Sequence, residues 1–465
     1  MGLKIALEHK RLDAASPYKP DAWRRHLCEA GLQHRYPNIP HDLQFGFDAG
    51  IRLISQTFTP PNRPSITQHR TEFNHIIQTE LQKRRYLGPV TREEAEFLLG
   101  AFQTSPLSII PKPGRPGKFR LIQNLSSPHS PRNSITSINS SIDSNQYPCT
   151  WGTFSTICLL IWRLPPGSQA AVCDVKEAYR TVPIRPEQWP GLVVRLDEDS
   201  FAIDTRDCFG LASGGGVYGL LGDAGAQIMR SRGIGPLSKW VDDHIFFRIL
   251  RSHLERYNLQ REQWAQDVAK NGGEIHDGGR LWFKGAIMPN GQPEEFDEDL
   301  SFAVQDLSLA SKRSVFLFPH QLPVCRQSLF TLFRRSQEDS LFTYSMADID
   351  ALSNDLGIPW ETEKDIPFSD VAPFIGFSWD LTNRTVCLPQ SKKEKYLQAI
   401  QEWESKPKHV LDEVQKLYEK LLHACHVIPA GWAYLTNLEA FMGLCHDSPF
   451  CPRSPPHQTP SDLLW

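Results

Sequence analysis

Two adjacent aspartates, Asp242 and Asp243, are the residues of this sequence best suited to chemistry. They lie between the apolar pair Trp240-Val241 and the apolar run 245–247. Carboxylates in such a half-buried stretch are costly unless a cation compensates them, and hard cations such as Mg²⁺ take carboxylate oxygens as ligands. The alternative is a solvated hairpin tip, because Asp favours turns and a chain with 53 acidic residues holds such pairs by chance.

Asp174 is a third candidate acid, and it ends the apolar stretch 171–173. Taken alone, it is better explained as a helix N-cap or a turn at the end of a strand. Tyr179 follows five residues later, and by itself it would be an ordinary core aromatic.

A glycine-rich run, 209–216, begins with Phe209 and Gly210 and precedes a predicted helix from Val217 through Met229. Glycines let a backbone approach a ligand closely, and the N-terminus of the helix could face a phosphate or a base. The run is not a phosphate loop of the Gly-x-x-x-x-Gly-Lys kind, because no lysine follows it. By itself it is a weak indication.

Four cations fall within a predicted hairpin at 111–120, where proline and glycine form the turn. Basic side chains there could hold a triphosphate, and a solvated, positively charged hairpin tip is the alternative. The four are Lys112, Arg115, Lys118 and Arg120.

Strand-like and helical segments alternate around these residues, which predicts an α+β fold. Helices are expected at about 73–85, 91–99, 391–403 and 414–424, and capping boxes at Thr91 and Ser391 open the second and third. Strands are expected at 108–110, 119–122, 171–173, 192–196, 201–203, 239–247 and 374–379.

The order of these features resembles the palm of reverse transcriptases. In that family a basic fingers hairpin, an Asp-x-x-x-x-aromatic motif, a Phe-Gly-Leu-x-Ser loop and an aromatic-x-Asp-Asp hairpin follow one another. Here the matching segments are 118–120, 174–179, 209–213 and 240–243, with 374–377 similar to the primer-grip hairpin. Trp240 stands where the family usually has Tyr or Phe. The sequences of these motifs are most similar to those of fungal retroelement enzymes, including those allied to tyrosine-recombinase retrotransposons.

The resemblance implies a right-hand polymerase fold with fingers, an antiparallel-sheet palm and a helical thumb. It divides the chain into segments with separate roles. These are an N-terminal extension (1–65) made irregular by prolines such as Pro40 and Pro64, fingers with N-terminal helices (66–170), a palm (171–388) with a solvated insertion at about 250–345, a helical thumb or connection (389–447) and a proline-rich tail (448–465).

The resemblance also implies RNA-directed DNA synthesis by a two-metal mechanism. Asp174 and Asp242 would bind two Mg²⁺ or Mn²⁺ ions together with the Val175 carbonyl, and Asp243 would assist. Tyr179 would reject a 2′-hydroxyl by size. The partners would be an RNA/DNA template–primer duplex and dNTPs. Contacts to the nucleotide would come from Lys112, Lys118, Arg120, Phe209 and Gly210.

Composition sets weak limits on these expectations. The formal net charge of −3 argues mildly against a nucleic-acid enzyme, although a local basic channel can lie in a neutral protein. Ten cysteines without regular spacing indicate reduced thiols. The N-terminus has no signal-peptide core, and the longest apolar run, 157–162, is too short to span a bilayer. We therefore expect an intracellular protein, nuclear or cytoplasmic, that is not secreted and has no membrane partner.

Three alternatives stay open. An enzyme that copies RNA into RNA would share the acids, but Tyr179 disfavours it. A catalytically silent, domesticated nucleic-acid-binding protein would retain the polymerase fold without a metal, and the intact acids disfavour that. A zinc site lacks Cys-x-x-Cys spacing, and its ligands would come from His423, Cys425, His426, Cys445, His446 and Cys451.

Overall fold

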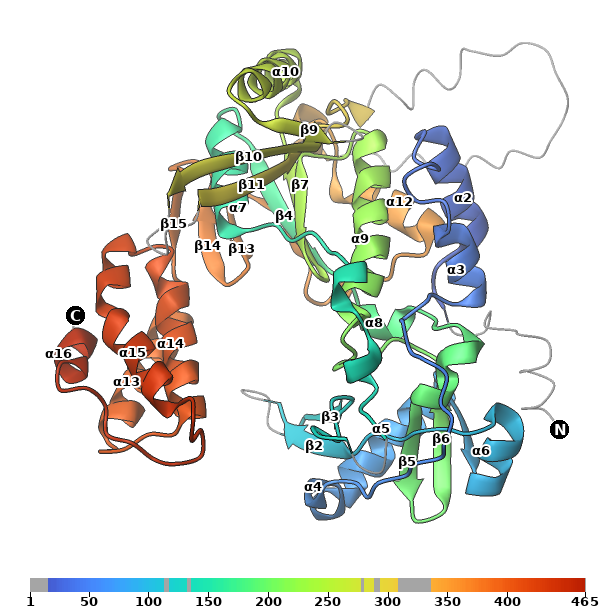
Figure 1. Cartoon of the computed structure of the whole chain (residues 1–465). Helices are drawn as coiled ribbons and strands as arrows, with labels where there is room; N and C mark the ends of the chain where they lie inside the picture. Colours follow the sequence, from blue (N-terminus) through green and yellow to red (C-terminus); the bar gives the residue numbers. More distant parts are fainter. Residues whose placement is uncertain are drawn as a thin grey trace, which may run out of the picture.

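The computed structural model describes residues 16–112, 117–131, 135–276, 280–287, 293–307 and 336–464. These residues form five antiparallel sheets with helices between and around them (Figure 1). The α+β fold expected from the sequence is confirmed. The right-hand layout is confirmed as well, because a sheet-centred palm joins a mixed fingers lobe to a helical thumb (Figure 1).

The palm is built on a four-stranded sheet in the order β12-β4-β8-β7. Side chains alternate between its two faces. Cys173 and Phe246 pack against two helices on one face, while Val172 and Phe247 pack against a third helix on the other. The strands are β4 (Gln169–Asp174), β7 (Leu237–Trp240), β8 (Asp243–Arg248) and β12 (Ile366–Ser369), and the helices are α9 (Gly214–Ser231) and α12 (Met346–Leu356) on the first face and α7 (Phe154–Arg163) on the second.

The fingers lobe contains two smaller sheets. The hairpin β5–β6 falls within the range 171–388 that the sequence assigned to the palm, yet β6 pairs with β1 of the fingers, with Tyr86 opposite Asp204. The chain therefore leaves the palm after α8 (Ala178–Thr181), returns to the fingers and re-enters the palm at α9. The elements of the fingers are α4 (Pro64–Gln68), α5 (Arg70–Gln82), β1 (Tyr86–Val90), α6 (Arg92–Leu99), β2 (Leu107–Pro111), β3 (Phe119–Gln123), β5 (Val193–Asp197) and β6 (Ser200–Asp204).

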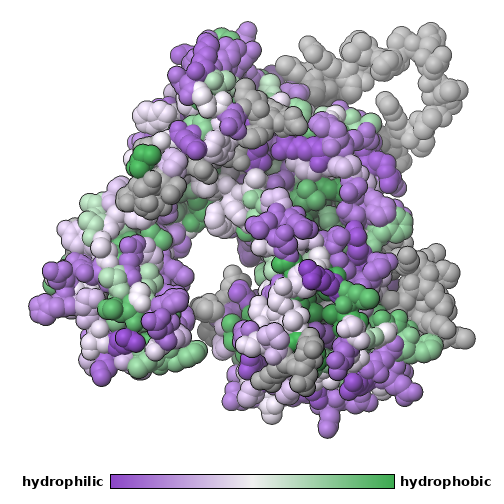
Figure 2. Space-filling view, viewed as in Figure 1, coloured by the Kyte–Doolittle hydropathy of each residue, from purple (hydrophilic) through white to green (hydrophobic). Residues whose placement is uncertain are grey.

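A three-stranded sheet, β13-β14-β15, leads from the palm to the thumb. The turn between β13 and β14 consists of Ile375 and Gly376, and both have the positive φ that a type I′ hairpin requires. Figure 2 shows an open channel between the thumb and the fingers. The elements are β13 (Val371–Phe374), β14 (Phe377–Asp380), β15 (Thr385–Cys387), α13 (Gln390–Glu404), α14 (Leu411–Cys425), α15 (Thr436–Cys445) and α16 (Thr459–Leu463).

The N-terminal extension is more regular than expected. The sequence predicts that Pro40 and Pro64 interrupt regular structure, but they lie in the first turns of α3 (Ile39–Phe45) and α4. A first-turn residue has no intrahelical partner for its N–H, so proline starts a helix there without cost. Pro20 opens α2 (Pro20–Glu29) in the same way. The expectation of irregular structure is therefore wrong at these helices.

The range 250–345, expected as a solvated insertion, contains α10 and the sheet β11-β10-β9. Its acids are partly internal, because Glu298 pairs with Arg163 of α7 and Asp299 pairs with Arg230 of α9. Both acidic side chains are less than a tenth exposed, so the prediction of a solvated segment is wrong at these two residues. Residues 308–335 lie outside the described residues. The elements are α10 (Leu254–Lys270), β9 (Glu274–His276), β10 (Arg280–Ile287) and β11 (Pro293–Asp299).

One predicted helix start is confirmed and one is wrong. The capping box at Thr91 is confirmed, with both of its hydrogen bonds present. The one expected at Ser391 is wrong, because α13 already begins at Gln390 behind Pro389. The C-terminal tail ends in α16, whose Leu463 is buried in the thumb core. The 3₁₀ helices are η1 (Asn139–Ser141), η2 (Ser144–Gln146), η3 (Pro186–Gly191), η4 (Arg251–His253), η5 (Asp339–Leu341) and η6 (Pro429–Tyr434).

None of the helices in the described ranges has both the length and the apolar character needed to cross a membrane.

His26 joins α2 to the palm. Its Nε2 lies 2.7 Å from Asp355 Oδ2, and its Nδ1 lies 2.8 Å from Arg232 Nη2. Burial lowers the pKa of His26, and the positive charge of Arg232 contributes to the same direction. Nδ1 must stay unprotonated to accept the hydrogen bond from Arg232.

We expect acid to weaken this contact. Because the pKa of His26 is lower in the folded chain than the unfolded value of about 6.5, its contribution to stability is complete above that pH and is lost as the pH falls. The free energy of unfolding, measured with denaturant, should therefore fall on acidification, and His26→Gln should flatten the fall. His34→Gln, at an exposed position, is the control. Equal slopes in the two variants would contradict the assignment.

Candidate active site

The two segments that carry the candidate acids are neighbours in the palm sheet. Asp174 at the end of β4 lies opposite Asp243 at the start of β8. The backbone N–H of Val175 donates to the Asp242 carbonyl at 3.0 Å. Trp240 also lies opposite Asp243, so Val241 and Asp242 form a two-residue turn. We call residues 237–248 the aspartate hairpin. Its register places three carboxylate-bearing residues at one end of the sheet.

The turn of the aspartate hairpin is strained. Val241 has φ 54°, and a β-branched residue rarely adopts this left-handed conformation. A positive φ at only the first turn residue is the pattern of a type II′ hairpin, where glycine is usual. Such strained residues cluster at functional sites. The buried His244 supports the turn, because its Nδ1 lies 3.0 Å from the Asp242 carbonyl.

Burial and mutual repulsion act on the hairpin acids. Burial, together with the charges of Asp242 and Asp174, raises the pKa of Asp243 to about 6. Burial and the charge of Asp174 also raise the pKa of Asp242. Lys364, in the loop between α12 and β12, opposes this effect. Its Nζ lies 2.5 Å from Asp174 Oδ2. One ammonium thus faces three carboxylates.

The donors at this place fit a hard divalent cation by their chemistry, because all of them are oxygens. In the structure, the carboxylate of Asp174 forms an ion pair with Lys364 and is not gathered with the carboxylates of Asp242 and Asp243 around a common point. Within the described ranges no three His, Cys, Asp or Glu side chains gather closely enough to hold a metal. A cation shared by Asp174 and Asp242 would therefore have to displace the Lys364 ammonium from Asp174.

Four of the six residues considered for zinc take packed positions, and the other two, His446 and Cys451, are exposed. Cys425 and Cys445 are buried in the thumb core. His423 stacks on Phe377, with 4.2 Å between ring centroids, and His426 stacks on Phe154 at 4.9 Å. Aromatic packing thus accounts for the positions of the two histidines.

Tyr179 lies on α8 beside the aspartate hairpin. Burial raises its pKa to about 12, and the charges of Asp207 and Asp242 act in the same direction, which places both carboxylates nearby. Its ring packs against Phe209, with 5.0 Å between centroids. Phe209 itself is 51% exposed. An exposed aromatic wall therefore adjoins the acids.

The loop 209–213 is held against the fingers. Gly210 has φ 102°, and a Cβ there would lie 2.9 Å from the Gln123 carbonyl of β3, so the close approach requires glycine. Asn139 fixes the loop from the side: its Nδ2 donates to the Gly210 carbonyl at 2.8 Å, and its Oδ1 accepts from the Ala212 N–H at 2.9 Å.

The three glycines after the loop form the first turn of α9 rather than part of the loop. A Cβ on Gly216 would lie 2.1 Å from the Tyr147 carbonyl, so the glycine lets the segment before α7 cross the helix. A Cβ on Gly214 would lie 2.7 Å from Asp207 Oδ1. Asp207 is fully buried, and neither of its carboxylate oxygens has a hydrogen-bond partner in the described part of the chain.

The predicted basic hairpin is the pair β2–β3. Ile110 lies opposite Arg120, and the Lys112 N–H donates to the Lys118 carbonyl. Side chains alternate along a strand, so Lys112, Lys118 and Arg120 share the face that points away from the fingers core. No ion pair is found for these three among the described residues; Arg115 lies outside them. Arg120 is three residues, about 10 Å along the strand, from the Gln123 contact with Gly210.

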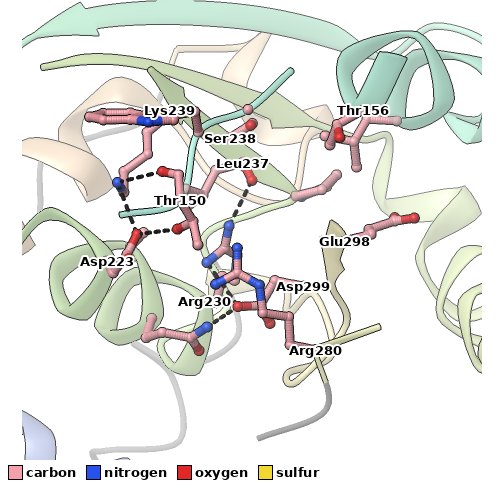
Figure 3. Close-up of a pocket in the computed structure, with 16 residues that line it drawn as sticks. Thr150, Thr156, Asp223, Arg230, Leu237, Ser238, Lys239, Arg280, Glu298 and Asp299 are labelled. Carbon is pink, nitrogen blue, oxygen red and sulfur yellow. Dashed lines mark hydrogen bonds and ion pairs between the residues drawn. The ribbon is translucent and has the colours of Figure 1, made fainter. Parts of the chain in front are cut away.

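Behind the aspartate hairpin lies a polar cavity between β7, α9 and β11 (Figure 3). Lys239, the residue before Trp240, reaches across it to Asp223 of α9 at 2.9 Å and to the Thr150 carbonyl at 3.2 Å. Trp240 is 43% exposed and packs against Trp151, with centroids 5.6 Å apart. The larger aromatic ring is accommodated here because it lies on an open surface.

No sequence pattern indicates Lys364 or Asn139 as residues of the site. Lys364 is 190 residues from Asp174, and no local pattern links them. Asn139 lies in a polar stretch without periodicity. Asp207 could have been noticed, because it is an acid directly before the apolar run that starts the glycine-rich loop.

Comparison with known proteins gives a limited result. No protein-family model matches the chain, and no curated protein matches it. Solved structures of foamy viral protease-reverse transcriptase are similar in arrangement. The form described as dRH, in complex with double-stranded DNA, has 11% identity and a TM-score of 0.46 over 100% of this chain and 58% of that one. One with an RNA/DNA hybrid has 12% identity and a TM-score of 0.48 over 100% and 45%. A third, with double-stranded DNA, has 14% identity and a TM-score of 0.45 over 100% and 69%. The chain thus spans about half the length of the first two.

Asp207 gives a prediction about stability. Burial raises its pKa to about 8, above the unfolded value of about 3.9. The contribution of protonated Asp207 to the free energy of unfolding is therefore complete below about pH 4 and is lost as the pH rises through 8. Asp207→Asn removes the ionisation and should be more stable than the natural chain at about pH 9, by on the order of 5 kcal/mol, because the folded and unfolded pKa values differ by about four and each pKa unit is worth about 1.4 kcal/mol.

Urea unfolding at several pH values measures this difference. The advantage of Asp207→Asn should shrink toward about pH 5, where Asp207 is protonated in the folded chain. Asp370→Asn, at an exposed position, should show no such dependence. A variant that is less stable than the natural chain at high pH would contradict the assignment.

Proposed function

We propose that this chain is a template-directed nucleotidyltransferase, an RNA-directed DNA polymerase that extends a DNA primer on an RNA template with dNTPs. The observation that carries the proposal is the β4–β8 register, which brings Asp174 to the aspartate hairpin and leaves three carboxylates with one ammonium. We also propose that the chain comes from a retroelement, because its motif sequences resemble those of fungal retroelement enzymes.

Asp174, Asp242 and the Val175 carbonyl would hold a pair of Mg²⁺ or Mn²⁺ ions, with Asp243 assisting. When bound, such ions activate the primer 3′-hydroxyl and stabilise the leaving pyrophosphate. The protein's own part is to fix the acids on rigid strands and to keep them partly desolvated, which strengthens their attraction for cations. His244 holds the turn by its contact with the Asp242 carbonyl.

The nucleotide would lie against Tyr179 and Phe209. The Tyr179 ring occupies the space next to the acids and would exclude a 2′-hydroxyl by size. Gly210 would let the backbone approach the base pair. Arg120 is the basic residue closest along β3 to that loop, so we assign it the first triphosphate contact; Lys118 and Lys112 stand farther out on the same face.

The partner would be a template–primer duplex in the channel between thumb and fingers (Figure 2). Foamy viral protease-reverse transcriptase has been solved with double-stranded DNA and with an RNA/DNA hybrid, and we propose the same class of partner here. Duplex binding depends on Lys and Arg contacts to phosphates and weakens as salt rises.

A catalytically silent nucleic-acid-binding protein is the second candidate. The observation in its favour is the Lys364–Asp174 ion pair, which satisfies one acid without any metal. This candidate predicts duplex binding without synthesis.

Primer extension separates the two candidates. Purified protein with Mg²⁺ or Mn²⁺, a DNA primer on an RNA template and dNTPs should give extended product. Asp242→Asn should reduce the rate at least about 10³-fold, because removing a metal ligand removes transition-state charge stabilisation worth several kcal/mol. Asp370→Asn, which is exposed and far from the hairpin in sequence, is the control.

Duplex affinity is measured alongside, at fixed salt. The polymerase proposal expects Asp242→Asn to bind the duplex about as well as the natural chain does. If the natural chain binds but makes no product, or if Asp242→Asn extends the primer as fast, the polymerase proposal is wrong.

A further inference from the structure

We propose that residues 46–50 of the N-terminal extension position the two walls of the nucleotide site. The inference rests on the proposed function, because the site it concerns is the nucleotide pocket formed by α8 and loop 209–213. We call residues 46–50 the clip. It holds the chain behind α8 on one side and the start of α9 on the other.

The clip pairs with the chain that follows α8. The N–H of Phe47 donates to the Pro183 carbonyl at 2.8 Å, and the Arg185 N–H donates to the Phe47 carbonyl at 3.1 Å. Gly46 makes this possible: its φ is 100°, and a Cβ there would lie 2.4 Å from the Arg185 nitrogen. Phe47 is buried in the main core. The clip is therefore fixed to the segment that begins two residues after α8, the helix that carries Tyr179.

The same clip holds the start of α9 through Ser213. The Ser213 hydroxyl donates to the Ala49 carbonyl at 2.7 Å, and Ser213 is fully buried. Serine at a helix N-cap usually accepts from a backbone N–H of the first turn. Ser213 is the N-cap of α9 but makes no such bond. Its hydroxyl is used for a long-range contact, which ties the end of loop 209–213 to the clip.

Polar contacts keep the clip in shape. Asp48 Oδ1 accepts from the Gly50 N–H at 2.8 Å and from Gln188 Nε2 at 2.6 Å. Gln188 Oε1 in turn accepts from the Ala49 N–H at 2.7 Å. Both backbone groups of Ala49 are thus hydrogen-bonded: the N–H donates to Gln188, and the carbonyl accepts from Ser213. Both anchors are buried, so the position of Ser213 follows the position of the clip.

The consequence concerns the spacing between Tyr179 and Phe209, whose rings are in contact. The position of Tyr179 depends on the attachment of the clip to the segment after α8. The position of Phe209 depends on the attachment of the clip to Ser213 at the start of α9. Loosening the clip should widen the nucleotide pocket while leaving the acids in place, because β4 and β8 do not contact the clip through any of these bonds. Ser213, Asp48 and Gln188 are positioning residues, and their loss should raise KM for dNTP more than it lowers kcat.

Ser213→Ala tests the inference. Ser231→Ala is its matched control, because the Ser231 hydroxyl also donates to a backbone carbonyl, Ile228, but at the far end of α9. In primer extension, Ser213→Ala should raise KM for dNTP about 3- to 10-fold, the range set by the loss of one hydrogen bond, with kcat within about twofold. Ser231→Ala should match the natural chain.

Asp48 supplies a second, exposed pair of variants that does not disturb the core. Asp48→Ala removes the contacts with Gly50 and Gln188 and should raise KM for dNTP in the same way. Asp48→Asn keeps an oxygen acceptor for both and loses only the charge of the ion pair with Arg185, which is exposed and therefore weak, so KM should be close to that of the natural chain. Equal KM values for Asp48→Ala and Asp48→Asn would count against the clip.

Hydrogen exchange makes the result independent of activity. Amides of residues 209–217 should exchange faster in Ser213→Ala than in Ser231→Ala. If the natural chain makes no product, the proposed function fails, and the exchange result alone then decides whether the clip holds the loop. If product forms but Ser213→Ala and Ser231→Ala have the same KM and the same exchange, the clip has no positioning role.

Discussion

The antiparallel register between β4 and β8 is the constraint on which the candidate site depends. It sets Asp174 opposite Asp243 and brings the Val175 N–H to the Asp242 carbonyl. A slip of one residue would turn every side chain of β8 to the opposite face of the sheet. Phe246 would then leave the core under α9 and α12. Hydrophobic packing on both faces of the palm therefore enforces the placement of the acids.

Burial and mutual repulsion both disfavour the charged form of the aspartates at this site. The aspartates are partly desolvated, which raises the pKa of Asp243 and disfavours three negative charges at one place. Lys364 relieves part of this repulsion through Asp174. The strained Val241 turn keeps the hairpin acids at the end of the sheet despite the cost. The excess of negative charge is what a divalent cation would compensate, and it links the stability of the site to its proposed chemistry.

Local signals were enough to predict the aspartate hairpin, the Thr91 cap and the strand that ends at Asp174, because alternation and capping depend on neighbouring residues. They failed where tertiary contacts decide. Prolines that look like breakers open helices, and the β5–β6 hairpin belongs to the fingers because β6 pairs with β1. The partner of Asp174 comes from 190 residues away, and no periodicity reports it.

The most direct test of the account is whether Asp174 and Asp242 bind one cation site together. Calorimetric titration of Mn²⁺ into the natural chain, Asp174→Asn, Asp242→Asn and the double variant forms a double-mutant cycle. We expect each single substitution to weaken the tightest binding step at least about tenfold, and the double variant to lose clearly less binding free energy than the sum of the two single losses. Additive losses, or Mn²⁺ binding that neither substitution changes, would contradict it.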